Sequence, residues 1–195
     1  MKVFDLYEIK DVVVEDVGLK RYINLDEKLM IKSKGKERGR FTKGKINLIE
    51  RLINLLGVPG HRGKKQKIMM HWTTGKWTTN ALTVLKAFKI IAEKTGQNPI
   101  QVFVKAIENA APRDEITVIE YGGARYPQAV DCSPQRRVDL TLKLMIQGSY
   151  VKCYGKKTKI VDALADEIIK AYNNDSTSSA ISKKIELERQ AQSSR

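Results

Sequence analysis

The sequence predicts a mainly α-helical fold: a helical bundle of about six helices with a projecting β-hairpin and a basic N-terminal arm. Apolar residues recur at helical spacing in successive segments, which Gly, Pro and polar cap residues separate. Residues 116–131 are instead rich in β-branched and aromatic residues around a Gly-Gly pair. We expect an N-terminal extension and basic arm at residues 1–45 and a helical domain at residues 46–195.

The N-terminal part predicts little regular structure. Val12, Val13 and Val14 suggest a short strand, and Gly18 suggests a turn after it. Residues 32–45, KSKGKERGRFTKGK, contain seven bases, one acid and three glycines. Because this composition offers no face that could enter a core, we expect an extended basic arm there.

Helical patterns occupy most of the remaining chain. The first runs from Ile46 to Leu56 and ends at Gly57, and the second runs from Ala81 to Ala92 and ends at Gly96. Cap residues and apolar spacing predict four later helices. Asn98 with Pro99 opens a helix that stops before Pro112, and Ser133 with Pro134 opens one that reaches about Cys153. Thr158 caps a third, which carries Ile160, Leu164 and Ile168, and the last contains Ile181 and Ile185.

The hairpin is predicted by two β-rich runs, 116–121 and 124–131, joined by Gly122 and Gly123, which tolerate positive φ. Pro127 cannot donate to a ladder, so its strand must be an edge or contain a bulge. Basic residues and Tyr121 and Tyr126 alternate along and beside this ribbon, a composition suited to nucleic acid. The alternative is that the tyrosines only pack on the helices beneath.

The charge distribution favours a polyanionic partner. The formal net charge is +14, and residues 31–77 hold 13 basic and 2 acidic side chains. Nucleic acid fits this excess better than a membrane, because the sequence has no basic amphipathic helix of large moment. No apolar run approaches the roughly 20 residues that cross a bilayer, and the N-terminus lacks a signal-peptide pattern. We therefore expect a cytosolic protein without a membrane partner.

Other chemistry finds little support in the sequence. Gly39–Lys45 matches GxxxxGK, but Ile46 stands where a nucleotide-binding loop needs Ser or Thr, and no strand precedes it. His61 and His71 have no nearby acid to orient them, and Cys132 and Cys153 lack the spacing of a zinc site. We expect no catalytic residues, no metal, no cofactor and no small-molecule substrate.

Two long stretches resemble a known family. Residues 96–113, GQNPIQVFVKAIENAAPR, and 120–140, EYGGARYPQAVDCSPQRRVDL, are similar to small-subunit ribosomal protein seven in its archaeal and eukaryotic-like form. GLKRYINL at 18–25, ALADEII at 163–169 and AISKKIELERQAQSSR at 180–195 fit the same family. Residues 1–17 and 57–77 fit it less closely.

The resemblance implies a structural protein that binds the 16S-type ribosomal RNA of the cytoplasmic small subunit and nucleates assembly of its head. It also implies a place at the subunit interface near messenger and exit-site transfer RNA, beside small-subunit proteins nine and eleven. By position, the residues that would bind ribosomal RNA are Lys34, Lys36, Arg38, Arg40, Lys43, Lys45, Arg62, Lys64, Lys65, Lys67, Lys76, Arg113, Arg136 and Arg137. The hairpin residues that would face messenger and transfer RNA are Gly122, Gly123, Arg125 and Tyr126.

One alternative stays open at this point. A DNA-binding architectural or regulatory protein would use the same cations, because lysine and arginine reach phosphates whatever the sequence. Such a protein would prefer duplex DNA over structured RNA.

Overall fold

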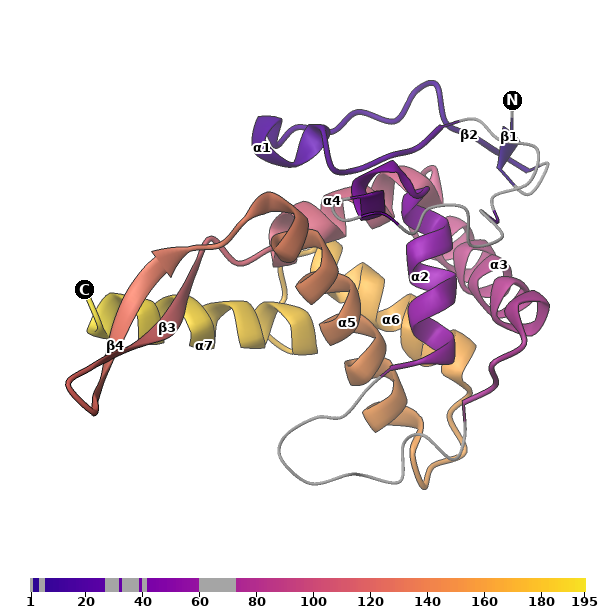
Figure 1. The fold of residues 1–195 in the computed structure, drawn as a ribbon. Coiled ribbons are helices and arrows are strands. Elements are labelled where there is room, and N and C mark those ends of the chain that lie inside the picture. Colours follow the sequence, from indigo (N-terminus) through magenta and orange to yellow (C-terminus); the bar gives the residue numbers. More distant parts are fainter. Residues whose placement is uncertain (1, 4–5, 27–31, 33–38, 40–41, 60–72) are drawn as a thin grey trace.

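The fold is seen in a computed structural model of the 195-residue chain, which describes residues 2–3, 6–26, 32, 39, 42–59 and 73–195. In these residues the chain is mainly helical, with two small antiparallel hairpins (Figure 1). This arrangement confirms the predicted fold class. Most of the predicted basic arm, including Lys34, Lys36, Arg38 and Arg40, lies outside the described residues.

The N-terminal segment runs along the helical body as two short strands and one helical turn. Strands β1 (Lys2–Val3) and β2 (Tyr7–Glu8) pair antiparallel, and α1 (Val17–Lys20) follows. The strand predicted at Val12–Val14 is wrong. The segment is extended there, but the backbone N–H and carbonyl of Val13 bond to the side-chain amide of Gln101, at 2.8 and 3.1 Å. A helix side chain thus takes the place of a neighbouring strand.

The helical body confirms the segments predicted after residue 45. The elements are η1 (Thr42–Lys45, a 3-10 turn), α2 (Leu48–Gly57), α3 (Trp77–Thr95), α4 (Pro99–Ala110), α5 (Pro134–Cys153), α6 (Ile160–Tyr172) and α7 (Ser179–Ser193).

The helix ends follow the cap residues closely. The side chain of Asn98 accepts the backbone N–H of Ile100 at 3.1 Å, and Gly96 ends α3 at a φ of 65°. Ser133 stands at the predicted cap of α5 but makes no side-chain cap bond. The predicted cap at Thr158 is wrong by one residue: Lys159 holds that position, so no side chain caps α6.

The core lies where α3, α4 and α6 meet, and α2 and α5 close it from the sides. The rings of Phe88 and Phe103 are fully buried with centroids 5.8 Å apart. Burial of each such side chain stabilises the fold by about 1.5–3 kcal/mol. Val3 and Leu19 of the N-terminal segment are buried in the same core, so this segment is packed onto the helices.

A buried carboxylate joins the last three helices. Glu167 of α6 is fully buried, and its side chain forms an ion pair with Lys152 of α5. It also accepts the hydroxyl of Ser178 at 2.9 Å and the backbone N–H of Ala180 at 3.3 Å, at the start of α7. A negative charge at a helix N-terminus is favourable, so Glu167 fixes where α7 begins.

The second hairpin extends away from the helical body, and α7 runs beside it (Figure 1). It consists of β3 (Asp114–Tyr121) and β4 (Ala124–Asp131), which confirms the predicted hairpin. Gly122 and Gly123 have φ values of 56° and 81°, as a two-residue turn between strands requires. Pro127 faces Val118 in a two-stranded sheet, so its missing N–H lies on an edge strand.

Candidate nucleic-acid interface

The predicted RNA-binding residues divide between described and undescribed parts of the chain. The described ones are Lys43, Lys45, Lys76, Arg113, Arg136 and Arg137. Besides the four arm residues already named, those that lie outside the described residues are Arg62, Lys64, Lys65 and Lys67.

A hollow of about 450 Å³ at the start of α5 gathers cations from two elements. Lys43 comes from η1, whereas Arg136 and Lys143 come from α5, about two turns apart along the same helix. The first N–H groups of α5 also lie here without the Ser133 side chain as a cap. Backbone N–H groups at a helix N-terminus together with three cations form a surface that suits phosphate.

Two carboxylates beside this hollow are held by arginines. The buried Arg51 donates to Asp139 at 2.7 Å and to the carbonyl of Tyr22 at 3.0 Å. Lys43 lies 3.6 Å from the same Asp139, and Arg136 contacts Glu115 at 2.6 Å. The hydrogen bond that Arg136 donates to Glu115 raises the pKa of Arg136. The hollow itself is lined by three cations, Lys43, Arg136 and Lys143, and one carboxylate, Asp139, so it is positive.

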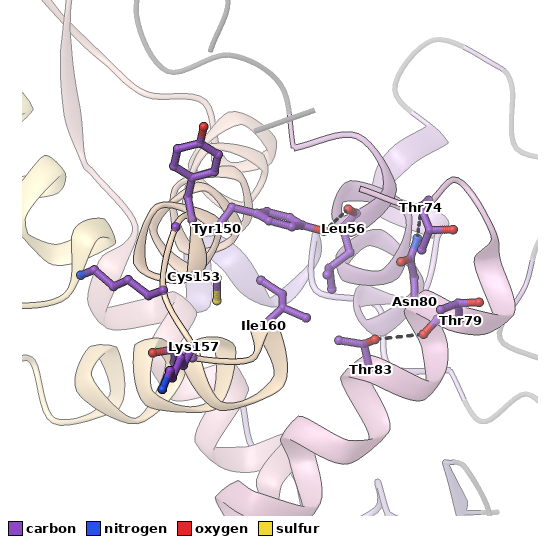
Figure 2. A pocket seen from close by; sticks show the side chains of 13 residues that line it. Leu56, Thr74, Thr79, Asn80, Thr83, Tyr150, Cys153, Lys157 and Ile160 are labelled. Carbon is purple, nitrogen blue, oxygen red and sulfur yellow. Dashed lines mark hydrogen bonds between the residues drawn. The ribbon is translucent and has the colours of Figure 1, made fainter. Parts of the chain in front are cut away.

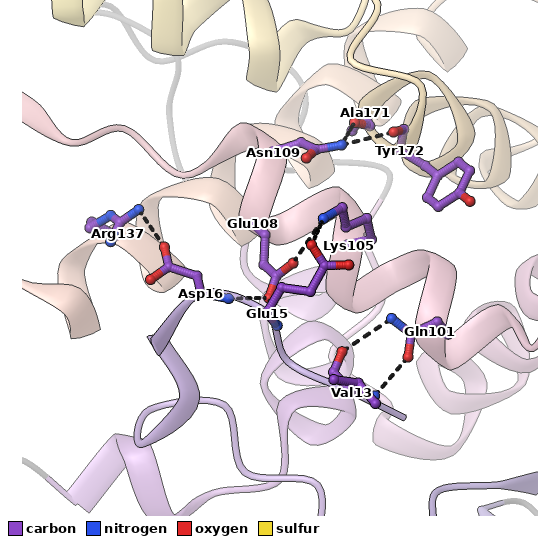
Figure 3. A network of polar contacts seen from close by, with 10 residues as sticks. All are labelled: Val13, Glu15, Asp16, Gln101, Lys105, Glu108, Asn109, Arg137, Ala171 and Tyr172. Carbon is purple, nitrogen blue, oxygen red and sulfur yellow. Dashed lines mark hydrogen bonds and ion pairs between the residues drawn. The ribbon is translucent and has the colours of Figure 1, made fainter. Parts of the chain in front are cut away.

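Arg137 is placed differently from Arg136. Its side chain is only 12% exposed and donates to the carbonyl of Pro112 at 3.1 Å. It also donates to Asp16 at 3.0 Å (Figure 3). In the same network Glu108 accepts the backbone N–H groups of Glu15 and Asp16, at 2.7 and 3.0 Å. In the free chain the Arg137 guanidinium therefore joins the N-terminal segment to the base of the hairpin.

The hairpin tip presents its aromatic side chains to solvent. Tyr121 is 81% exposed and Tyr126 is 59% exposed, so the alternative in which both pack on the helices does not hold. Arg125 is also exposed and lies 3.7 Å from Glu120. At the base, Arg113 is exposed, and its backbone N–H donates to Glu188 of α7 at 3.0 Å. The structure thus separates a tip with Gly122, Gly123, Arg125 and Tyr126 from the hollow at α5.

Sequence reasoning missed four lysines, one in the hollow at α5 and three in a loop. Lys143 lies in the hollow at α5, and Lys156, Lys157 and Lys159 are exposed in the loop between α5 and α6. The loop sequence, YGKKTK at 154–159, has the same Gly and Lys composition as the arm, and that signal could have identified it.

Trp77 does not offer an open stacking platform. Its ring packs against the core, its indole N–H is buried without a partner among the described residues, and the Lys32 ammonium lies 5.5 Å from the ring centroid. Trp72, like His61 and His71, lies outside the described residues.

The two thiols are not activated. Burial and the neighbouring Glu115 raise the pKa of Cys132 to about 11, and burial together with Asp162 raises the pKa of Cys153. Neither cysteine is a thiolate at neutral pH, and a thiolate is what nucleophilic chemistry needs. In the described part of the chain no group of three or more His, Cys, Asp or Glu is placed so that it could hold a metal ion, and no helix is long and apolar enough to cross a membrane.

Comparison with known proteins gives one consistent result. The family model described as ribosomal protein S7p/S5e matches residues 19–195. Small ribosomal subunit protein uS7 of Nanoarchaeum equitans is 52% identical over 100% of this chain and 99% of its own. The uS7 proteins of Thermoplasma volcanium and Methanosphaera stadtmanae are 44% and 42% identical, each over 98% of this chain and over 99% and 97% of their own.

Proposed function

Because the chain belongs to the ribosomal protein S7p/S5e family, whose members are RNA-binding components of the cytoplasmic small ribosomal subunit and not enzymes, we propose that it binds ribosomal RNA early and nucleates assembly of the subunit head. The hollow at the start of α5 carries this proposal. Lys43, Arg136 and Lys143 approach it from separate positions on a rigid helical body, so an RNA backbone that meets all three is fixed in orientation.

In this proposal the hairpin has a separate task. Its exposed tip, with Tyr126 and Arg125, reaches toward messenger and exit-site transfer RNA at the subunit interface. The supporting observation is that the hairpin tip projects from the helical body, away from α5 (Figure 1). Exposed aromatic and cationic side chains are suited to unpaired bases and backbone.

We further propose that α7 contacts small-subunit protein eleven and transfer RNA, and that small-subunit protein nine is a second neighbour. Glu167 sets the position of α7, and Arg195 at its end pairs with Asp114 of β3 at 3.0 Å. Ile185 of α7 is about half exposed. A helix fixed at both ends offers a partner a surface that needs little ordering on binding.

Assembly in vitro tests the proposal. The full chain is mixed with the 3′ major domain of small-subunit RNA, and proteins nine and eleven are added afterwards. We expect both proteins to join only when this chain is present, and duplex DNA in excess to leave the complex intact. Equal joining without the chain would contradict a nucleating role, and displacement by DNA would contradict specific RNA binding.

A hairpin variant separates the two tasks. Replacing Arg125 and Tyr126 by Ala should leave affinity for the isolated RNA domain within twofold and disturb translation by subunits that contain the variant. A loss of RNA affinity as large as that of a Lys43→Ala, Lys143→Ala variant would show that the hairpin is a primary anchor instead.

A further inference from the structure

A second cavity lies at the other end of α5 from the hollow at its start, between the start of α3, the end of α5 and the α5–α6 loop (Figure 2). Its volume is about 580 Å³. Figure 2 shows Tyr150 and Cys153 on one side and Asn80, Thr79 and Thr83 on the other. This volume falls in the range of sites that take small organic groups, roughly 300–1,000 Å³.

The floor of the cavity is apolar and rigid. Leu56 and Tyr150 are buried, and the Tyr150 hydroxyl donates to the Leu56 carbonyl at 2.8 Å, which holds the ring in place. Asn80 is also buried and donates to the Thr74 carbonyl at 2.9 Å. Among the described residues, the Asn80 side chain makes only this hydrogen bond. Its carboxamide oxygen can therefore accept a hydrogen bond from a ligand.

The rim of the cavity is cationic. Lys156 and Lys157 line it and are exposed, Tyr154 is 46% exposed beside them, and the described residues that line the cavity include no Asp or Glu. An apolar ligand would not need the lysines, and a phosphate alone would not need the apolar floor. A nucleotide needs both, because its base is a flat, weakly polar ring and its phosphates are anions.

We propose that this cavity receives one unpaired base of ribosomal RNA, whose flanking phosphates bind Lys156 and Lys157. The base lies against the aromatic and aliphatic walls, and Asn80 and the threonine hydroxyls of α3 meet its polar edge. The inference rests on the proposed function, since the occupant is part of the RNA that the chain binds. It adds a stacking contact that recognises a single-stranded nucleotide, whereas the hollow at α5 recognises only backbone.

Filling the cavity tests the proposal. Thr83→Phe places a ring inside it, whereas Leu82→Phe places the same ring on the next residue of α3, which does not line the cavity and is half exposed. We expect Thr83→Phe to weaken binding of small-subunit RNA by roughly tenfold, the scale of one lost base stack, with an unchanged salt slope. Leu82→Phe should bind as the unmodified chain does. Equal affinity of all three proteins would overturn the proposal.

The thiol of Cys153 gives a second readout that needs no substitution in the cavity. It lines the cavity and is half-buried, whereas Cys132 is buried near the hairpin base, so mass spectrometry of maleimide-treated protein reports the two sites separately. We expect bound RNA to slow modification of Cys153 at least fivefold and to leave Cys132 unaffected.

Three other outcomes of the maleimide experiment would overturn the proposal, and each has a different meaning. Equal rates for Cys153 with and without bound RNA would mean that the cavity stays empty in the complex. Protection that requires other small-subunit proteins would identify a protein segment as the occupant. A Cys153 that reacts only in urea would mean that this chain fills the cavity itself. In all three cases RNA binding persists, whereas a failure of the proposed function would abolish it.

Discussion

Asp16 and Arg137 are 121 residues apart in the chain, and their carboxylate and guanidinium meet at 3.0 Å. Asp16 also caps α1, since its side chain accepts the N–H of Gly18 at 2.8 Å. One ion pair therefore joins the N-terminal segment, the start of α5 and, through the carbonyl of Pro112, the base of the hairpin. Arg137, which the sequence analysis assigned to RNA binding, therefore stabilises the fold of the free protein.

We predict that Arg137→Ala lowers the free energy of unfolding by about 1–3 kcal/mol, because it leaves two partly buried acceptors without their donor. Urea unfolding at neutral pH measures this. Arg136→Ala is the matched control: the Arg136 side chain is 57% exposed, so its ion pair with Glu115 should contribute no more than about 1 kcal/mol. If Arg137 served RNA rather than the fold, its removal would spare stability and lower the salt dependence of RNA binding.

Gly148 lies where α5 passes the start of α7. A Cβ added at Gly148 would stand 2.5 Å from the Cβ of Ser179 and 3.3 Å from a carboxylate oxygen of Glu167. We predict that Gly148→Ala lowers the free energy of unfolding by about 1–3 kcal/mol, since one of the two helices must move. The urea midpoint should fall by a corresponding amount.

Two further variants show whether the close approach is the cause. Gly75→Ala adds a Cβ that meets nothing within 4 Å, so its urea midpoint should stay close to that of the unmodified chain. Ser179→Gly in the Gly148→Ala background removes the shortest contact and should restore part of the loss. Equal urea midpoints for Gly148→Ala and Gly75→Ala would contradict the prediction, because Gly→Ala alone lowers the entropy of the unfolded chain and does not destabilise.

The elements that the sequence predicts are those whose signal is local. The Asn98-Pro99 cap, the stop at Gly96 and the Gly122-Gly123 turn each depend on the conformational preference of one or two residues, and the structure confirms all three. The strand predicted at Val12–Val14 was wrong for the converse reason. A β-branched run indicates an extended backbone, but its partner is set by tertiary packing, and here that partner is the side chain of Gln101.

The candidate site follows the same division. Composition identifies segments rich in Gly and Lys as exposed basic loops, and the loop with Lys156 and Lys157 could have been found in that way. Composition cannot separate Arg136 from Arg137, although one is 57% exposed and the other 12%. Their difference depends on Asp16, whose position relative to α5 no local pattern encodes. The cavity beside Tyr150 is likewise formed by three segments that are distant in sequence: Leu56, residues 74–83 and residues 150–160.

Tyr150 predicts how stability depends on alkaline pH. Burial raises its pKa from 10.0 to about 12, so the folded state keeps the ring neutral while the unfolded chain ionises first. The resulting contribution to stability is fully present below pH 10 and is lost as pH rises toward 12. We predict that the urea midpoint falls over this window and falls less steeply in Tyr150→Phe. The variant should also lose about 0.5–1.5 kcal/mol at neutral pH, with the bond to Leu56.

A Tyr150→Phe variant whose midpoint falls as steeply as that of the unmodified chain would assign the alkaline loss to other groups. Cys132 is the first of these, since its pKa is raised to about 11. Cys132→Ser distinguishes the two contributions, because the Cys132 contribution is lost as pH rises from 9 to about 11, whereas that of Tyr150 is lost from 10 to about 12.

The hollow at the start of α5 makes a prediction about salt. Each lysine that contacts a phosphate releases a counterion on binding, so the slope of log affinity against log salt becomes shallower by about 0.7–0.9 for every contact removed. Lys43→Ala with Lys143→Ala should therefore reduce the slope by about 1.5 and weaken RNA binding most at low salt. Filter binding or fluorescence anisotropy across a salt series measures both quantities.

Lys94→Ala is the control for this double variant. Lys94 has a comparable exposure to solvent, but it lies near the end of α3 and pairs with Asp166 at 2.7 Å, outside the hollow. Its removal changes the net charge without removing a phosphate contact, so affinity should fall slightly through the general field and the slope should stay the same. If Lys94→Ala and the hollow variant shifted the slope equally per charge, RNA would be attracted by net charge alone. A smaller shift for Lys94→Ala would place the RNA backbone at the N-terminus of α5, since counterion release counts contacts and not total charge.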